Sequence, residues 1–250
     1  DLLEAMTTVE SGVAVGQPYA KHEERATAIH EAGHAVCAHL YSENMLSTRL
    51  SIRKRGSSGG HHQAMSIEDR FAEWRSEEIA ELIWIMGAMA AEYVFYGQTT
   101  TGVGGDVYST TANAVRMVGS SGMGPTPVDL SDRIDDRDRR DEEQERIMKR
   151  FEALGTQIMH RSGGSMMNDD GVSGVLADAG KRRLAAALIG QSFVIAYNTI
   201  RHNREGTDYV AGRLIAAGEL YGDDVVQLLD DARLEQPEID VLDEDTWPVI

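Results

Sequence analysis

Residues 28–36 of the chain read Ala-Ile-His-Glu-Ala-Gly-His-Ala-Val. Two histidines, His30 and His34, are four residues apart, so in a helix their rings lie one turn above each other and can reach one metal ion. Glu31 lies beside that position, where a carboxylate can take a proton from water. The pattern H-E-x-x-H is typical of a zinc hydrolase. The alternative is a helix with two solvated or core histidines.

The flanks of this pentapeptide predict a helix. Apolar residues recur at steps of three and four: Ala26, Ile29, Gly33, Val36 and Leu40. No proline occurs between Lys21 and Tyr41. A glycine inside a helix costs about 1 kcal/mol relative to alanine. We therefore expect Gly33 to serve a close packing contact.

A β-hairpin is predicted after this helix. Alternating apolar and polar residues over 48–54 predict a strand, residues 55–60 a Gly/Ser turn, and residues 61–67 the returning strand. Neighbouring side chains point to opposite faces of a strand, so His61 and His62 are not expected to join one site. We expect both to be solvated strand histidines rather than ligands.

The next helix is predicted over residues 76–95, where an apolar stripe is made by Ile79, Leu82, Ile83, Met86, Ala90 and Val94. We expect Ser76 to cap its start and Gly97 to end it. A Gly/Thr-rich loop then leads to Asp106, which we place at the N-terminus of a further helix, where the helix dipole favours a carboxylate. A plain N-cap is the alternative for Asp106.

The C-terminal half predicts mostly helix. Residues 131–150 are dense in charges of both signs, which predicts a solvated helix or a mobile insert. Residues 161–173 are rich in Gly, Ser, Asn and Asp and predict a loop. A buried helix is predicted over 184–200, and two shorter helices over 209–217 and 223–234.

Charge and cysteine content exclude some classes of function. The 250 residues carry a formal net charge of −17, whereas a nucleic-acid-binding protein needs a basic face, so no nucleic-acid partner is expected. The single cysteine, Cys37, cannot form an internal disulfide, which is typical of a reducing compartment.

Three blocks, in order, resemble the FtsH-type ATP-dependent zinc metalloproteases. The first is the zinc helix around residues 28–36. The second, Gly87 to Gly97, looks like the family's Gly-Gly-Arg-x-Ala-Glu-Glu block, with Ala88 and Met89 in place of its second Gly and its Arg. The third, Thr-Thr-Gly-Val-Gly-Gly-Asp at residues 100–106, is similar to the family's Thr-Thr-Gly-Ala-x-Asn-Asp block.

This resemblance implies a mainly α fold with a small β-sheet, in a zincin-like helical peptidase domain. Residues 1–20 would be the end of an upstream ATPase lid plus a linker. The zinc metallopeptidase domain would span residues 21–234, with an insert or mobile segment at 130–173. Residues 235–250 would form an acidic C-terminal tail.

For the site, the resemblance implies one Zn²⁺ per chain, held by His30, His34 and Asp106. Glu31 would be the catalytic base. Glu92 is expected to orient a ligand histidine, with third zinc ligand and structural helix carboxylate as its alternative roles. A substrate is expected to add as an extra strand to the family's edge strand, which falls on His62, Gln63, Ala64 and Met65.

The implied function is that of a zinc-dependent endopeptidase that hydrolyses unfolded or unfolding proteins. ATP would act only through an AAA+ ATPase domain outside this sequence, which lacks a G-x-x-x-x-G-K-[ST] loop. The resemblance also implies a homo-hexamer at the cytoplasmic face, with any membrane anchor in segments outside these residues.

Two other functions are compatible with these residues. The residues before Asp106, Val-Gly-Gly at 103–105, differ from the family's Ala-Ser-Asn. A catalytically inactive, zinc-stabilised scaffold or interaction module is therefore one alternative. The other is a metal-free helical binding domain in which the pentapeptide is a coincidence.

Overall fold

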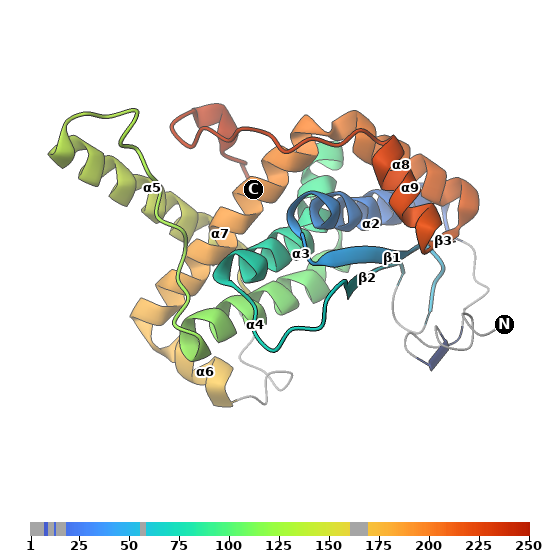
Figure 1. The fold of residues 1–250 in the computed structure, drawn as a ribbon, viewed down its shortest axis with the longest axis horizontal. Helices are drawn as coiled ribbons and strands as arrows, with labels where there is room; N and C mark the ends of the chain where they lie inside the picture. The colour runs from blue at the N-terminus through green and yellow to red at the C-terminus, as the bar shows by residue number, and fades with distance from the viewer. Residues whose placement is uncertain (1–7, 10–12, 14–18, 56–58, 161–169) are drawn as a thin grey trace.

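The computed structural model describes residues 8–9, 13, 19–55, 59–160 and 170–250, so most of the predicted linker before residue 21 lies outside it. The fold is mainly helical with one small sheet, as predicted (Figure 1). Its elements are α2 (Lys21–Tyr41), β1 (Met45–Ser51), β2 (His61–Ser66), α3 (Arg75–Tyr96), the 3-10 helix η1 (Thr101–Val103), α4 (Gly104–Ser120), α5 (Arg137–Ile158), α6 (Asp170–Ala177), α7 (Ala179–His202), α8 (Arg204–Ala217), β3 (Glu219–Tyr221), α9 (Asp223–Asp231) and the 3-10 helix η2 (Glu244–Thr246).

The helix that carries the two motif histidines packs against α3 through a pair of glycines. A Cβ atom on Gly33 would collide with the carbonyl oxygen of Gly87, and one on Gly87 would collide with the carbonyl oxygen of Gly33. The expected packing role of Gly33 is thus confirmed. Because the two backbones touch there, the face of α2 with His30 and His34 is held at a fixed distance from α3.

The sheet is antiparallel, in the order β2-β1-β3, so β2 is an edge strand. The returning strand is confirmed within one residue. The first strand was predicted over 48–54, but β1 begins at Met45 and ends at Ser51. Its alternation is interrupted by a register shift between Ser47 and Arg49, which hides its true start from a pattern of period two.

The predicted N-cap of α3 is wrong. The helix begins at Arg75, after the N-cap Trp74, whose backbone N–H donates to Glu77 Oε2 at 2.7 Å. Gly97 ends the helix at a φ of 68°, as expected. By length and composition α3 could cross a membrane, yet 56% of its apolar window is buried inside the protein, so core packing accounts for its apolarity.

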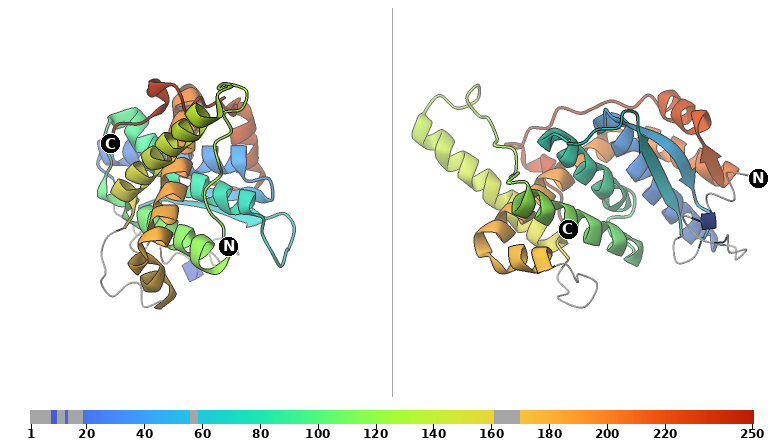
Figure 2. Two further views of the ribbon diagram at one scale, coloured as in Figure 1. Left: turned by 90° about the vertical axis from the view of Figure 1, so that its left-hand side faces the viewer. Right: turned by 60° about the horizontal axis from the view of Figure 1, so that its bottom comes forward.

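Helix α5 lies along α7 (Figure 2). The charged segment predicted over 131–150 is helical only from Arg137, and the helix continues to Ile158. Its first half is mostly exposed and charged, as predicted. Its second half packs on α7 through Ile147, Phe151, Leu154 and Ile158. The charge-rich sequence predicted a solvated helix because the apolar face begins only near its end.

A loop is predicted over 161–173, and residues 161–169 of it lie outside the described part of the chain. From Asp170 onward the prediction is wrong, because helix α6 begins there. The three later helices are confirmed, as α7, α8 and α9. The acidic C-terminal segment packs on α5 and α7: the ring of Trp247 lies 4.9 Å from that of Phe151, and Asn198 donates to the carbonyl of Thr246 at 2.9 Å.

A buried ion pair joins β1 to β3. Arg49 donates to Glu219 Oε1 from Nη2 and Nε at 2.8 and 3.0 Å, and both side chains are 3% exposed. Although burial raises the pKa of Glu219, hydrogen bonds from Arg49, Tyr221 and Ser51 lower it below its ordinary value of 4.5. The ionised carboxylate therefore stabilises the fold at neutral pH, and this contribution disappears as the pH falls through the lowered pKa.

We expect Glu219→Gln to lower the free energy of unfolding by about 3 kcal/mol at pH 7, because it removes the carboxylate charge that pairs with the buried Arg49. The difference from the unsubstituted chain should shrink below about pH 4.5, measured by urea unfolding at a series of pH values. The exposed Glu238→Gln is the control. A difference that stays constant from pH 7 to pH 3 would contradict the assigned ion pair.

Candidate metal centre

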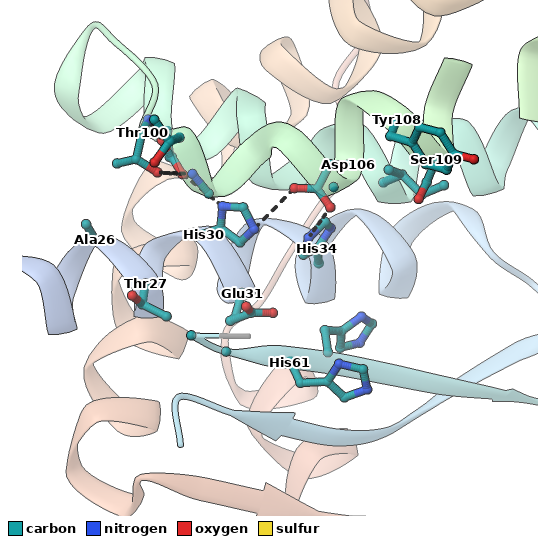
Figure 3. Close-up of a pocket in the computed structure, with 18 of the residues that line it drawn as sticks. Ala26, Thr27, His30, Glu31, His34, His61, Thr100, Asp106, Tyr108 and Ser109 are labelled. Carbon is teal, nitrogen blue, oxygen red and sulfur yellow. Dashed lines mark hydrogen bonds and ion pairs between the residues drawn. The ribbon is translucent and has the colours of Figure 1, made fainter. Parts of the chain in front are cut away.

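Three side chains from two helices converge on one point (Figure 3). His30 and His34 project from α2, and Asp106 from the first turn of α4. His30 Nε2 lies 3.3 Å from Asp106 Oδ2, and His34 Nε2 lies 3.4 Å from Asp106 Oδ1. One donor atom of each residue lies within 4.8 Å of the others. Asp106, about seventy residues after the two histidines in the sequence, therefore lies beside them in the fold.

The geometry of these donor atoms fits a zinc ion. Two ligands at about 2.0–2.1 Å from a tetrahedral ion lie about 3.3–3.4 Å apart. Each histidine Nε2 lies at this distance from one carboxylate oxygen of Asp106, His30 from Oδ2 and His34 from Oδ1. Asp106 Oδ2 is buried and makes no hydrogen bond of normal geometry within the described part of the chain. Two imidazoles and a carboxylate are also a ligand set that zinc accepts in catalytic sites.

The far side of each imidazole is held by a hydrogen-bond acceptor on α3. His30 Nδ1 lies 2.8 Å from Glu92 Oε1, and His34 Nδ1 lies 3.1 Å from the carbonyl oxygen of Trp84. Glu92 in turn accepts hydrogen bonds from the backbone N–H and the hydroxyl of Thr100. Glu92 thus lies on the Nδ1 side of the His30 ring. The carboxylate that converges with His30 and His34 is that of Asp106, not that of Glu92.

Acidic groups dominate the electrostatics of this cluster. Burial lowers the pKa of His30, but the carboxylates of Asp106 and Glu92 raise it by more, to about 10. Burial raises the pKa of Asp106, but the two histidines lower it well below its usual range. A concentration of carboxylates around two imidazoles favours a bound cation, whether protons or a metal ion.

Glu31 is 5% exposed, and its carboxylate faces the strand side of the cleft (Figure 3). Burial raises the pKa of this carboxyl, and His30 and His34 lower it. A Cβ atom on Gly60 would collide with Glu31 Oε1. Gly60 is therefore part of the wall around Glu31. Sequence reasoning assigned it only to a turn, because nothing local to Gly60 indicates a contact thirty residues away.

A cleft of about 1140 Å³ contains the cluster and is bordered by α2, α3, α4 and the start of β2. Of the four strand residues expected to bind substrate, His62 lines this cleft. The other three, Gln63, Ala64 and Met65, follow it along the edge strand outside the cleft wall. His61 also lines the cleft.

The prediction that His62 is a solvated histidine is wrong. Its side chain is buried, with the residue 8% exposed, and burial lowers its pKa well below the ordinary value. Trp84 Nε1 donates to His62 Nδ1 at 2.9 Å, and His62 Nε2 lies 2.9 Å from Ser47 Oγ. The strand pattern could not show this, because the partner that covers His62 comes from α3.

We expect Gly60→Ala to reduce hydrolysis of an unfolded protein by about tenfold or more, since the added methyl group displaces the Glu31 carboxylate and misplacement by about 1 Å costs up to a hundredfold in rate. Zinc content should be unchanged, because the three atoms nearest to the added methyl group all belong to Glu31. Initial rates on casein and zinc analysis check this. Gly124→Ala, with open space around it, is the control.

Comparison with known proteins shows the family of the chain. The family model described as Peptidase family M41 matches residues 18–228. The ATP-dependent zinc metalloprotease FtsH 2 of Sphaerobacter thermophilus is 30% identical over 234 residues, which are 93% of this chain and 31% of that protein. FtsH 4 of the same organism is 32% identical over 65% of the chain and 26% of its own length. FtsH of Mycobacterium tuberculosis is 36% identical over 43% of the chain and 14% of its own length. The chain thus spans about a third or less of these curated relatives.

Proposed function

Since this chain belongs to peptidase family M41, we propose that it is a zinc-dependent endopeptidase that hydrolyses unfolded polypeptides. The observation that carries the proposal is the convergence of His30, His34 and Asp106, whose donor atoms lie within 4.8 Å of one another in the wall of a cleft of about 1140 Å³. The relatives are named zinc metalloproteases, which agrees with this set of donors.

In this proposal His30, His34 and Asp106 hold the zinc ion. Zinc, when bound, lowers the pKa of a coordinated water toward 7 and polarises the scissile carbonyl. Glu92 and the carbonyl oxygen of Trp84 accept hydrogen bonds from the two Nδ1 atoms. In the neutral rings these bonds place the proton on Nδ1 and leave each Nε2 able to bind the metal, which is the usual function of such outer partners.

Glu31 is the proposed general base. Its carboxylate is buried in the cleft beside both histidines, so it can receive the proton of the attacking water and pass it to the leaving amine. Burial raises its pKa, which makes it a stronger base than an exposed glutamate. The wall at Gly60 limits where this carboxylate can point.

The proposed substrate is an extended polypeptide. β2 is the edge strand of the sheet and borders the cleft at His61 and His62. A chain that adds to this edge is bound through its main chain, which makes binding tolerant of sequence and requires that the substrate be unfolded. Residues 62–65 are the proposed contact.

The dependence on ATP that the relatives' names state would come from a part of the protein outside these residues. We propose the same arrangement here, with an upstream AAA+ domain that delivers unfolded chains. The homo-hexamer and the location at the cytoplasmic face of a membrane stay predictions. Light scattering of the isolated chain tests the first, and fractionation of cells tests the second.

The proposed activity is tested by incubating the zinc-loaded chain with unfolded casein. We expect degradation that stops when a chelator removes the metal and returns when zinc is added back. Zinc bound at one per chain without any cleavage would instead support an inactive scaffold. Less than one tightly bound zinc per chain, again without cleavage, would support a metal-free binding domain.

A further inference from the structure

Two side chains in the cleft wall, His62 and Trp84, have no part in the chemistry described so far. They link the edge strand β2 to helix α3, directly beside the histidine pair. We propose that Trp84 and His62 are positioning residues, which hold β2 at a fixed place relative to His34 so that a polypeptide added to β2 reaches the site. This inference rests on the proposed function.

The protonation of His62 follows from its two partners. A Trp indole N–H can only donate a hydrogen bond, so His62 Nδ1 must be the acceptor and carry no proton. In the neutral ring the proton is then on Nε2, which donates to Ser47 Oγ at 2.9 Å. Both ring nitrogens are thereby used within the protein. His62 is consequently a bridge between β1, β2 and α3 rather than a fourth metal ligand.

Trp84 contacts both sides of the cleft. Its carbonyl oxygen lies 3.1 Å from His34 Nδ1, while its indole donates to His62. The His62 ring is also nearly parallel to the His34 ring, with centroids 6.5 Å apart and planes 14° apart. One residue of α3 therefore fixes the orientation of a candidate ligand and the position of the substrate strand together.

The position of β2 needs such a support because β2 is at the edge of a three-stranded sheet and pairs only with β1 within the described chain. A shift of the strand by about 1 Å would move a bound peptide away from the reacting groups. A long substrate, which pairs with β2, depends on this position. A short peptide that contacts only the region around His30 and His34 does not.

The test measures binding and zinc content as well as activity. The chain carrying Glu31→Gln is loaded with zinc, and its Kd for fluorescently labelled unfolded casein is measured by anisotropy. Adding Trp84→Phe keeps the bulk of the ring and removes the N–H donor. We expect Kd to rise about tenfold, as for the loss of one buried hydrogen bond. Zinc should stay at one per chain, because the carbonyl of Trp84 is unchanged.

Matched variants separate positioning from a general loss of structure. The exposed Trp74→Phe is the control and should leave Kd within about twofold. His62→Leu should match Trp84→Phe, and the double variant should be no worse than either. His62→Asn, whose amide oxygen can still accept from the indole, should restore much of the binding. Ser47→Ala breaks the link from the other end if Trp84→Phe does not fold.

Activity gives the second readout. In the chain with native Glu31, Trp84→Phe should raise KM for casein about tenfold, and kcat/KM should fall further for casein than for a short peptide. An equal loss on both substrates, or an unchanged Kd and KM for casein, would overturn the inference while the proposed function stands. A parent chain that neither binds nor cleaves casein would instead overturn the proposed function.

Discussion

We expect Glu31→Gln to lower kcat for casein hydrolysis by about 10²–10⁴-fold, the usual contribution of a positioned general base. The amide has almost the same size and keeps the contact with Gly60, but it cannot accept a proton at neutral pH. Its neighbours His30 and His34 are unchanged, so zinc should still bind at one per chain. The measurement is the rate of casein cleavage beside the metal content of the same preparation.

The control for this substitution is Glu23→Gln, which removes a carboxylate on the same helix at the rim of the same cleft. Glu23 is exposed and ion-paired with Lys54 at 3.5 Å, so its loss should change the rate by less than about twofold. Equal rates for Glu31→Gln and the unsubstituted chain would show that the proton moves by another route and that the roles assigned here are wrong.

The second large effect is expected for Asp106→Ala. Loss of one of the three proposed ligands should take retained zinc from one per chain to far below one and reduce casein cleavage to background. Bound zinc should also stabilise the folded chain. A metal present at 1,000 times its Kd adds about 4 kcal/mol to the free energy of unfolding, which raises Tm by roughly 8–16 °C for a chain of this size. This gain should be absent in the variant.

Differential scanning calorimetry with and without added zinc measures this gain, and Asp138→Ala is its control. Asp138 is also an acidic residue in the first turn of a helix, α5, and is exposed. Like Asp106, Asp138 is favoured by the dipole of its helix, but it does not lie beside the two histidines. If zinc stabilised Asp106→Ala as much as it stabilises the unsubstituted chain, Asp106 would not be a ligand.

The sequence predicts the two helices that carry the candidate metal ligands, because each is specified by residues close together in the chain. The helix Lys21–Tyr41 follows from the spacing around His30, and the packing role of Gly33 follows from its cost in a helix. The place of Asp106 in the first turn of α4 follows from the loop before it. In each case the residues that decide the structure are neighbours in the chain.

The features that the sequence did not predict depend on partners far along the chain. His62 was expected to be solvated because its cover, Trp84, belongs to another element. Gly60 was read as a turn residue because the carboxylate it borders is that of Glu31. The solvated helix predicted over 131–150 misses the start of the packed face of α5 at Ile147, because α7, on which that face packs, begins more than twenty residues after α5 ends. Tertiary contacts override the local pattern in all three.

The proposed activity depends on one zinc ion held by His30, His34 and Asp106. Crystals of the zinc-loaded chain, measured on both sides of the zinc absorption edge, test it directly. We predict one anomalous peak per chain, bounded by the Nε2 atoms of the two histidines and a carboxylate oxygen of Asp106. The absence of a peak, or a peak whose third protein ligand is Glu92, would contradict it.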